Sequence, residues 1–176
     1  MVNLAKNQYH QAISFPRTDG EKALGQVFED LLAHHGIISE RTAPYTPAQN
    51  GQSERSGGVI TIKARCMIIS AHLPHDLWPE TVAAAAYILN RIPTKSGITP
   101  FESLYQSKPT INHMKTYGCR AYPLICNIPK LQKLEPRAHI GYLVGHSSRN
   151  IYRTWVPSKK QVIRIRDVTF DEATYY

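Results

Sequence analysis

The apolar positions in the first third of the chain predict short elements of mixed type. Between Ala23 and His35, apolar residues recur with a helical period, and Gly36 stands where such a helix would end. Tyr9–Phe15, which stops at a proline, and Ile37–Thr42 each favour a short strand. The apolar positions of the predicted helix are Leu24, Val27, Phe28, Leu31 and Leu32.

A loop and three helices are predicted in the middle of the chain. Ala43–Gln52 holds two prolines, an Asn-Gly pair and small polar residues, which predicts a loop. Ser53 can cap the helix that follows, and Asp76 can cap another whose buried, Ala-rich body is Val82–Leu89. Thr99 can cap a short helix with proline at its first position. The apolar positions of the first helix are Val59, Ile62, Cys66 and Ile69.

From about Gly118 onward, short runs rich in β-branched and aromatic residues replace the helical pattern. Pro, Gly, Ser and Asn separate these runs at intervals of about ten residues, which predicts a small barrel or sandwich. The change of pattern within residues 107–118 is a candidate domain boundary. The runs are Ala121–Ile125, Ile140–Val144, Tyr152–Val156 and Gln161–Ile165.

Composition places the chain among ordinary globular proteins, with 42% hydrophobic and 19% charged residues in a length of 176. The longest apolar stretch, Val82–Leu89, is far shorter than the ~20 residues of a membrane span, so no membrane partner is expected. No secretory or other targeting signal is readable, and we expect the nucleus or the cytoplasm. Three cysteines without repeated spacing, Cys66, Cys119 and Cys126, favour a reducing compartment and buried thiols.

The net charge of +8 is concentrated in one segment. Residues 103–166 carry 12 Lys and Arg against a single acid, Glu135, whereas residues 1–54 carry 4 basic and 6 acidic groups. A solvated basic face and a surface for nucleic-acid phosphates both fit this segment. Cations without local partners favour the second interpretation, because phosphate binding depends on them.

Two acidic residues lie in stretches that suit a chemical site. RTDGE (Arg17–Glu21) places Asp19 after a candidate strand, and PYTPAQNGQSER (Pro44–Arg55) places Glu54 in the first turn of a helix. From the residues alone, the ordinary interpretations are favoured: a turn explains Asp19, and a favourable interaction with the helix dipole explains Glu54.

Several blocks, taken in order, resemble the integrase of copia-type LTR retrotransposons. The resemblance extends from about Arg17 to Glu172. It implies an α/β, RNase H-like integrase core over residues 1–106, truncated at its front. A linker over 107–116 and an all-β, SH3-like domain of the Pol polyprotein over 117–172 would follow. Besides PYTPAQNGQSER, the matching blocks are ARCM (Ala64–Met67), LPHDLWPE, AAYILNRIPT, TPFES (Thr99–Ser103), YGCRAY (Tyr117–Tyr122) and RDVTFDE (Arg166–Glu172).

The resemblance implies that Asp19 and Glu54 are the second and third carboxylates of an Asp, Asp, Glu triad. Such triads hold two Mg²⁺ ions about 4 Å apart, on either side of the scissile phosphate. Mg²⁺ suits this role because it prefers oxygen ligands and keeps water positions open for the substrate.

The resemblance also implies contacts with DNA next to the metal site. Gln49 and Asn50 would form the loop beside the reacting DNA end. Arg55, Lys63 and Arg65 follow on or near the next helix and are candidates for DNA phosphates, with an ordinary solvated face as the alternative. The expected partners are retroelement ends and target DNA, with RNA as a second candidate, and the parent integrase is expected to be an oligomer.

The family's first Asp and its upstream His/Cys zinc module have no counterpart before Asp19. We therefore expect these 176 residues to be the C-terminal part of an integrase region, without strand-transfer activity of their own. Two alternatives stay open. One is a non-catalytic nucleic-acid-binding module, and the other is a retroelement remnant with no function.

Overall fold

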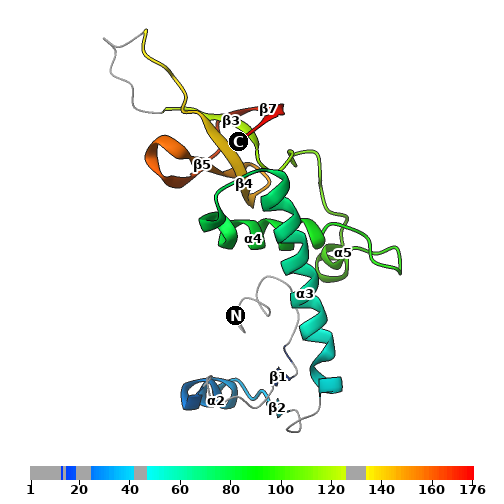
Figure 1. Cartoon of the computed structure of the whole chain (residues 1–176). Helices are drawn as coiled ribbons and strands as arrows, with labels where there is room; N and C mark the ends of the chain where they lie inside the picture. The colour runs from blue at the N-terminus through cyan, green and yellow to red at the C-terminus, as the bar shows by residue number, and fades with distance from the viewer. Residues whose placement is uncertain (1–12, 14, 19–24, 42–46, 126–133) are drawn as a thin grey trace. The chain divides into compact units, whose positions relative to one another are not determined.

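The computed structural model describes residues 13, 15–18, 25–41, 47–125 and 134–176, and for Arg17, Thr18, Arg41 and residues 47–54 it describes the backbone alone (Figure 1). By the contacts within the chain, Met1–Gly58 and Val59–Tyr176 form two units, of which each is described by itself. The predicted boundaries of an integrase core, a linker and an SH3-like domain stay predictions.

The first unit contains a parallel strand–helix–strand arrangement. Strand β1 (Arg17–Thr18) pairs with β2 (Glu40–Arg41) in parallel, and α2 (Gly25–His34) connects them. Helix α2 confirms the predicted helix, and Gly36 follows it with a left-handed φ of +64°. Of the apolar face of α2, Leu32 is buried whereas Val27 is 83% exposed, because a two-stranded sheet offers a helix little apolar surface.

The predicted strands of this unit are only partly recovered. The segment predicted over Ile37–Thr42 forms a strand at Glu40–Arg41. Most of Tyr9–Phe15 lies outside the described residues, and β1 begins two residues after Phe15, beyond the proline.

Helix α3 (Pro47–Ser70) corrects two predictions. Pro47–Gln52 was predicted as a loop and is the start of this helix, so Ser53 lies within the helix and cannot be its cap. Proline is tolerated in a first turn, where its missing N–H has no helical partner. A glycine costs only about 1 kcal/mol inside a helix.

Two more helices follow α3. The 3-10 helix η2 (His75–Leu77) leads into α4 (Trp78–Leu89), whose N-cap is Leu77, so the prediction of Asp76 as the cap is wrong. The short helix α5 (Pro100–Tyr105) confirms the predicted cap at Thr99. The N–H of Glu102 donates to the Thr99 hydroxyl at 3.0 Å, and the Glu102 carboxylate accepts from the Thr99 N–H at 3.1 Å.

The second unit ends in a five-stranded antiparallel sheet with the strand order β6-β5-β4-β3-β7. The four predicted strands are confirmed, and β7 is a fifth that the apolar pattern did not indicate. In Figure 1 the colours of its strands follow the chain from the green-yellow β3 to the red β7. The strands are β3 (Cys119–Pro123), β4 (Gly141–Ser148), β5 (Ile151–Val156), β6 (Gln161–Ile165) and β7 (Val168–Tyr175), with the 3-10 helix η3 (Pro157–Lys159) between β5 and β6.

Helices and sheet of the second unit share one core. Ile68 and Ala71, at the end of α3, and Leu77 of η2 are buried together with Tyr142 and Val144 of β4. The chain enters β3 through Gly118, whose φ is +79°. A Cβ on this glycine would lie 2.3 Å from the Cβ of Ala71, so only glycine permits this close approach.

The free thiols divide between the core and the surface. Cys119 is buried, as predicted, and burial raises the pKa of its thiol to about 11. Cys66 is exposed on α3, so the prediction of a buried thiol is wrong for this residue. Cys126 lies outside the described residues.

Candidate nucleic-acid interface

The two predicted metal-binding carboxylates belong to the front of the chain. Asp19 lies outside the described residues, and Glu54 lies in the first half of α3, where only the backbone is described. Gln49 and Asn50 belong to the first turns of the same helix rather than to the predicted loop. The structure does not place these four side chains, so their roles and the Mg²⁺ assignment stay predictions.

The three predicted phosphate-binding cations of α3 are exposed. Lys63 and Arg65 are two positions apart, and two steps of an α-helix turn side chains about 200° from each other. The helix therefore presents these two cations on opposite flanks and does not gather them for one phosphate. Contact of DNA with Arg55, Lys63 or Arg65 stays a prediction.

An ion pair between α4 and β5 occupies one of the cations of the basic segment. Arg153 Nε donates to Glu80 Oε2 at 2.5 Å, and Arg153 Nη2 donates to the second carboxylate oxygen, Oε1. The side chains are only 23% and 19% exposed, and the hydrogen bond to Glu80 raises the pKa of Arg153. This two-pronged contact fastens the sheet to α4 and leaves Arg153 unavailable to a phosphate.

A second ion pair fixes β7 to the segment before β3. Lys115 Nζ lies 3.0 Å from Glu172 Oε1, and the N–H and hydroxyl of Thr116 donate to Glu172 Oε2 at 2.9 and 2.8 Å. The hydrogen bond from Lys115, followed by those from Thr116, lowers the pKa of Glu172 to about 2. Lys115 is thus also engaged in holding the fold.

Four exposed cations lie on the edge strand β6 or directly beside it in sequence. They form no ion pair within the part of the chain that the structure describes. Lys159 ends η3, Lys160 takes a left-handed turn with φ of 48°, Arg164 lies on β6, and Arg166 comes directly after it. We call these four residues the basic edge. Unpaired cations can bind phosphates, and on an edge strand they also oppose pairing with other chains.

A cluster of aromatic and histidine side chains, which the sequence did not indicate, lies where α4 meets β4 and β5. Tyr87 Oη lies 2.7 Å from His113 Nε2, and the ring of His146 stacks on Tyr87 with centroids 5.1 Å apart. The Arg91 guanidinium lies 3.4 Å from the centroid of the Tyr87 ring, and the Tyr152 hydroxyl donates to the His113 carbonyl.

Burial lowers the pKa of His146 to about 4, with further contributions from His113 and Arg91. Burial also lowers the pKa of His113. Near neutral pH the cluster therefore holds uncharged imidazoles packed between helix and sheet. Tyr87 and Arg91 are four residues apart, and His146 pairs with Tyr152 across the β4–β5 hairpin, whereas the contacts of His113 and the stacking of His146 on Tyr87 join residues far apart in sequence.

Among the described residues, no three His, Cys, Asp or Glu side chains gather in a way that could hold a metal ion. Within the same residues, no helix is both long and apolar enough to cross a bilayer.

Comparison with known proteins matches both the C-terminal domain and most of the chain. Residues 119–176 match the retroviral polymerase SH3-like domain. The chain is 36% identical over 160 residues to the retrovirus-related Pol polyprotein from transposon TNT 1-94 of Nicotiana tabacum, covering 88% of this chain and 12% of that protein. It is 30% identical over 152 residues to the retrovirus-related Pol polyprotein from transposon RE2 of Arabidopsis thaliana, covering 85% and 10%.

A solved structure also aligns with the chain. It is a chain of the simian T-cell lymphotropic virus intasome in complex with PP2A regulatory subunit B56 gamma, determined by cryo-electron microscopy. The alignment covers 92% of this chain and 58% of that one, with a TM-score of 0.48 and 17% identity.

This chain spans only 12% and 10% of the two curated relatives. The similarity nevertheless covers most of the chain, and the match to the SH3-like domain includes the whole five-stranded sheet. The chain therefore belongs to the family of retrovirus-related Pol polyproteins of transposons, and it carries the retroviral polymerase SH3-like domain over residues 119–176.

Proposed function

We propose that this chain is part of the integrase region of such a Pol polyprotein and that it binds DNA through the basic edge. The observation that supports DNA binding is the row of exposed cations at Lys159, Lys160, Arg164 and Arg166 along one edge strand. A phosphate backbone binds such a row by displacing counterions, without any base-specific contact.

The packing of the second unit supports a defined position for this surface. Strand β5 pairs along β6, and Arg153 of β5 is held by Glu80 of α4. The core shared by α3, η2 and β4 adds a second connection between helices and sheet. DNA bound at the basic edge would therefore keep a fixed orientation with respect to α4.

The front of the chain is proposed to be a portion of an RNase H-like core. The parallel pair β1 and β2, joined by α2 and followed by α3, supports this assignment. Asp19 follows β1 and Glu54 lies in α3, so one carboxylate comes after a strand and the other is on a helix. When bound, Mg²⁺ would supply activation of the attacking hydroxyl and stabilisation of the leaving oxygen.

Residues 1–176 by themselves are proposed to lack strand-transfer activity, because Asp19 and Glu54 are two of the three carboxylates that the family uses. The test is incubation of the purified chain with Mg²⁺ and an oligonucleotide that carries a retroelement end. No joined product is expected. Joining that disappears in Asp19→Asn and Glu54→Gln variants would contradict the proposed inactivity and would support both metal ligands.

The test of DNA binding is fluorescence anisotropy with a labelled duplex over a series of salt concentrations. Replacement of all four residues of the basic edge by glutamine should reduce the slope of log K against log salt by about 3 to 4, since each lost phosphate contact removes about 0.9. The control variant, Lys95→Gln with Lys108→Gln, removes two exposed cations elsewhere in the second unit and should change the slope by less than about 1. Equal affinity and slope for wild type and the fourfold variant would refute this surface.

A further inference from the structure

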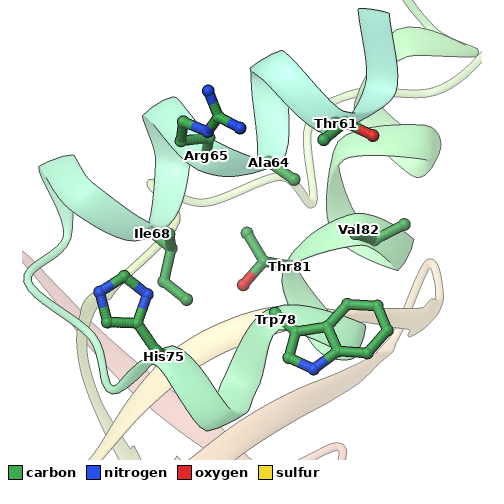
Figure 2. Close-up of a pocket in the computed structure, with 8 residues that line it drawn as sticks. All are labelled: Thr61, Ala64, Arg65, Ile68, His75, Trp78, Thr81 and Val82. Atoms are coloured by element: carbon green, nitrogen blue, oxygen red, sulfur yellow. The ribbon is translucent and has the colours of Figure 1, made fainter. Parts of the chain in front are cut away.

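A cavity of about 250 Å³ lies between α3 and the segment formed by η2 and α4 (Figure 2). Its buried lining is apolar: Ala64 and Ile68 of α3 are each 6% exposed. Thr81 is 1% exposed, and its hydroxyl is already engaged, because it donates to the Leu77 carbonyl at 2.9 Å and lies 2.6 Å from Tyr117 Oη. The buried part of the cavity thus offers little hydrogen bonding to a ligand.

The rim of the cavity differs from its lining. Figure 2 shows Arg65 on α3, with His75 and Trp78 on the opposite side and Ile68 and Thr81 between them. Trp78 is 64% exposed, which is unusual for a large aromatic side chain. Arg65 is exposed and forms no ion pair with another described residue. Glu80 of the nearby helix α4 is already paired with Arg153.

The apolar surface continues beyond the rim along α3. Ile62 and Ile69 lie three positions before and four positions after Arg65, so both are its neighbours on the helix surface. Each of these isoleucines is 58% exposed. An apolar strip with one cation at its centre therefore borders the cavity.

We infer that this cavity is a docking site for an acidic peptide segment of a partner protein. One aliphatic or aromatic side chain of the peptide enters the cavity beside Trp78, and a neighbouring carboxylate pairs with Arg65. The volume suits one or two side chains and is smaller than a site for a drug-sized ligand. Exposed Trp and Arg side chains are the types that contribute most to protein–protein affinity.

Charge and polarity favour this occupant over a nucleotide. A base in the cavity would leave its polar edge without partners, because Thr81 is engaged and the remaining buried lining is apolar. The inference does not depend on the proposed DNA binding, since none of the four basic-edge residues lines the cavity.

The experiment begins with selection of random dodecapeptides displayed on phage against the whole 176-residue chain. The Arg65→Glu variant serves for counter-selection. The enriched sequences should share Leu, Phe or Trp next to Asp or Glu. An enriched peptide is then titrated into ¹⁵N-labelled protein, whose two tryptophans, Trp78 and Trp155, give separate indole N–H resonances. The Trp78 resonance should shift to saturation while the Trp155 resonance stays in place.

A matched control separates local contact from overall charge. Lys63→Glu makes the same charge change on the opposite flank of α3 and should retain peptide affinity, whereas Arg65→Glu should weaken it about tenfold or more. Anisotropy with the DNA duplex is measured on the same variants, so loss of DNA binding is recognised separately.

Four outcomes of the binding experiments would overturn the inference. They are enrichment of basic or purely polar peptides, failure of any enriched peptide to shift Trp78, equal weakening by Lys63→Glu, and a Trp78 shift with single-stranded DNA that displaces the peptide. A Trp78 resonance that moves with protein concentration alone would assign the cavity to a second copy of the chain and would also overturn it.

Discussion

Replacement of His146 by phenylalanine should flatten the stability profile of the second unit on the acid side. Burial lowers the pKa of His146 from its ordinary value of 6.5 to about 4. Between these values the unfolded chain binds a proton that the folded chain does not bind, so the free energy of unfolding falls as pH falls. Above pH 6.5 the contribution is complete. Phenylalanine keeps a ring against Tyr87 and binds no proton, so this dependence disappears.

The size of the effect follows from the pKa shift. A change from 6.5 to about 4 corresponds to roughly 3 kcal/mol between neutral pH and pH 4. The imidazole of His146 is only partly buried, and solvent screening reduces the figure to roughly 2 kcal/mol. The lowered pKa of His113 also makes the free energy of unfolding fall toward acid pH. His113 is present in wild type and variant alike, so its contribution cancels when the two are compared. At neutral pH the variant should be at least as stable, because His146 Nε2 has no hydrogen-bond partner.

The assay is urea unfolding at several pH values between 7.5 and 4. Trp78 and Trp155 both belong to the second unit, so tryptophan fluorescence follows the unfolding of that unit. The control is His75→Gln, which removes an exposed histidine and should keep the wild-type slope. A His146→Phe variant that loses as much stability as wild type between pH 6.5 and 4 would refute the assignment of a buried neutral imidazole.

Three further predictions concern contacts within the second unit. Gly118→Ala should destabilise the second unit well beyond the control Gly97→Ala, because both glycines have φ of +79° but only Gly118 would place a Cβ 2.3 Å from that of Ala71. Thermal unfolding of both variants measures the difference, and equal losses would contradict the clash. Glu172→Gln should reduce the loss of stability between pH 4.5 and about 2, since the lowered pKa of Glu172 makes its contribution complete above pH 4.5 and removes it as pH falls, whereas Asp171, whose pKa is also lowered, still contributes. A pH series of urea unfolding midpoints checks it, and an unchanged acid limb would count against the ion pair. Glu80→Gln should cost about 3 kcal/mol in urea unfolding, because it leaves the half-buried arginine of β5 without its counter-charge. A cost below about 1 kcal/mol, the value of an exposed pair, would show that solvent screens this contact.

Local signals in the sequence located most elements correctly. The predicted strand over Gln161–Ile165 matches β6, and the cap at Thr99 is present with its reciprocal bond from Glu102. These successes share one cause. The alternation of a strand and the chemistry of a cap act within a few residues, so no distant contact is needed to see them.

The wrong predictions arose where a longer element outweighed a local preference. Pro47–Gln52 contains proline and glycine, yet it starts a 24-residue helix whose later turns offset the cost of Gly51. Strand β7 was missed because its apolar alternation is limited to Val168 and Phe170 and breaks at the adjacent acids Asp171 and Glu172. It exists because five of its residues pair with β3, a contact that joins segments about fifty residues apart.

The choice of the basic edge as the candidate surface also depended on contacts between residues distant in sequence. The sequence established that residues 103–166 are strongly basic, but it gave no means of ranking the cations. The structure ranks them through contacts that join residues 73 and 57 positions apart, which engage Arg153 with Glu80 and Lys115 with Glu172.

Positive charge in this segment therefore has two separate effects. The paired cations hold the sheet to α4 and to the segment before β3, and their replacement should affect stability. Replacement of the unpaired basic edge should affect the salt dependence of DNA binding and leave stability almost unchanged. A variant set that mixed the two classes would lower DNA binding by partial unfolding as well as by loss of charge. For this reason unfolding and anisotropy have to be measured on the same proteins before any cation is assigned to DNA.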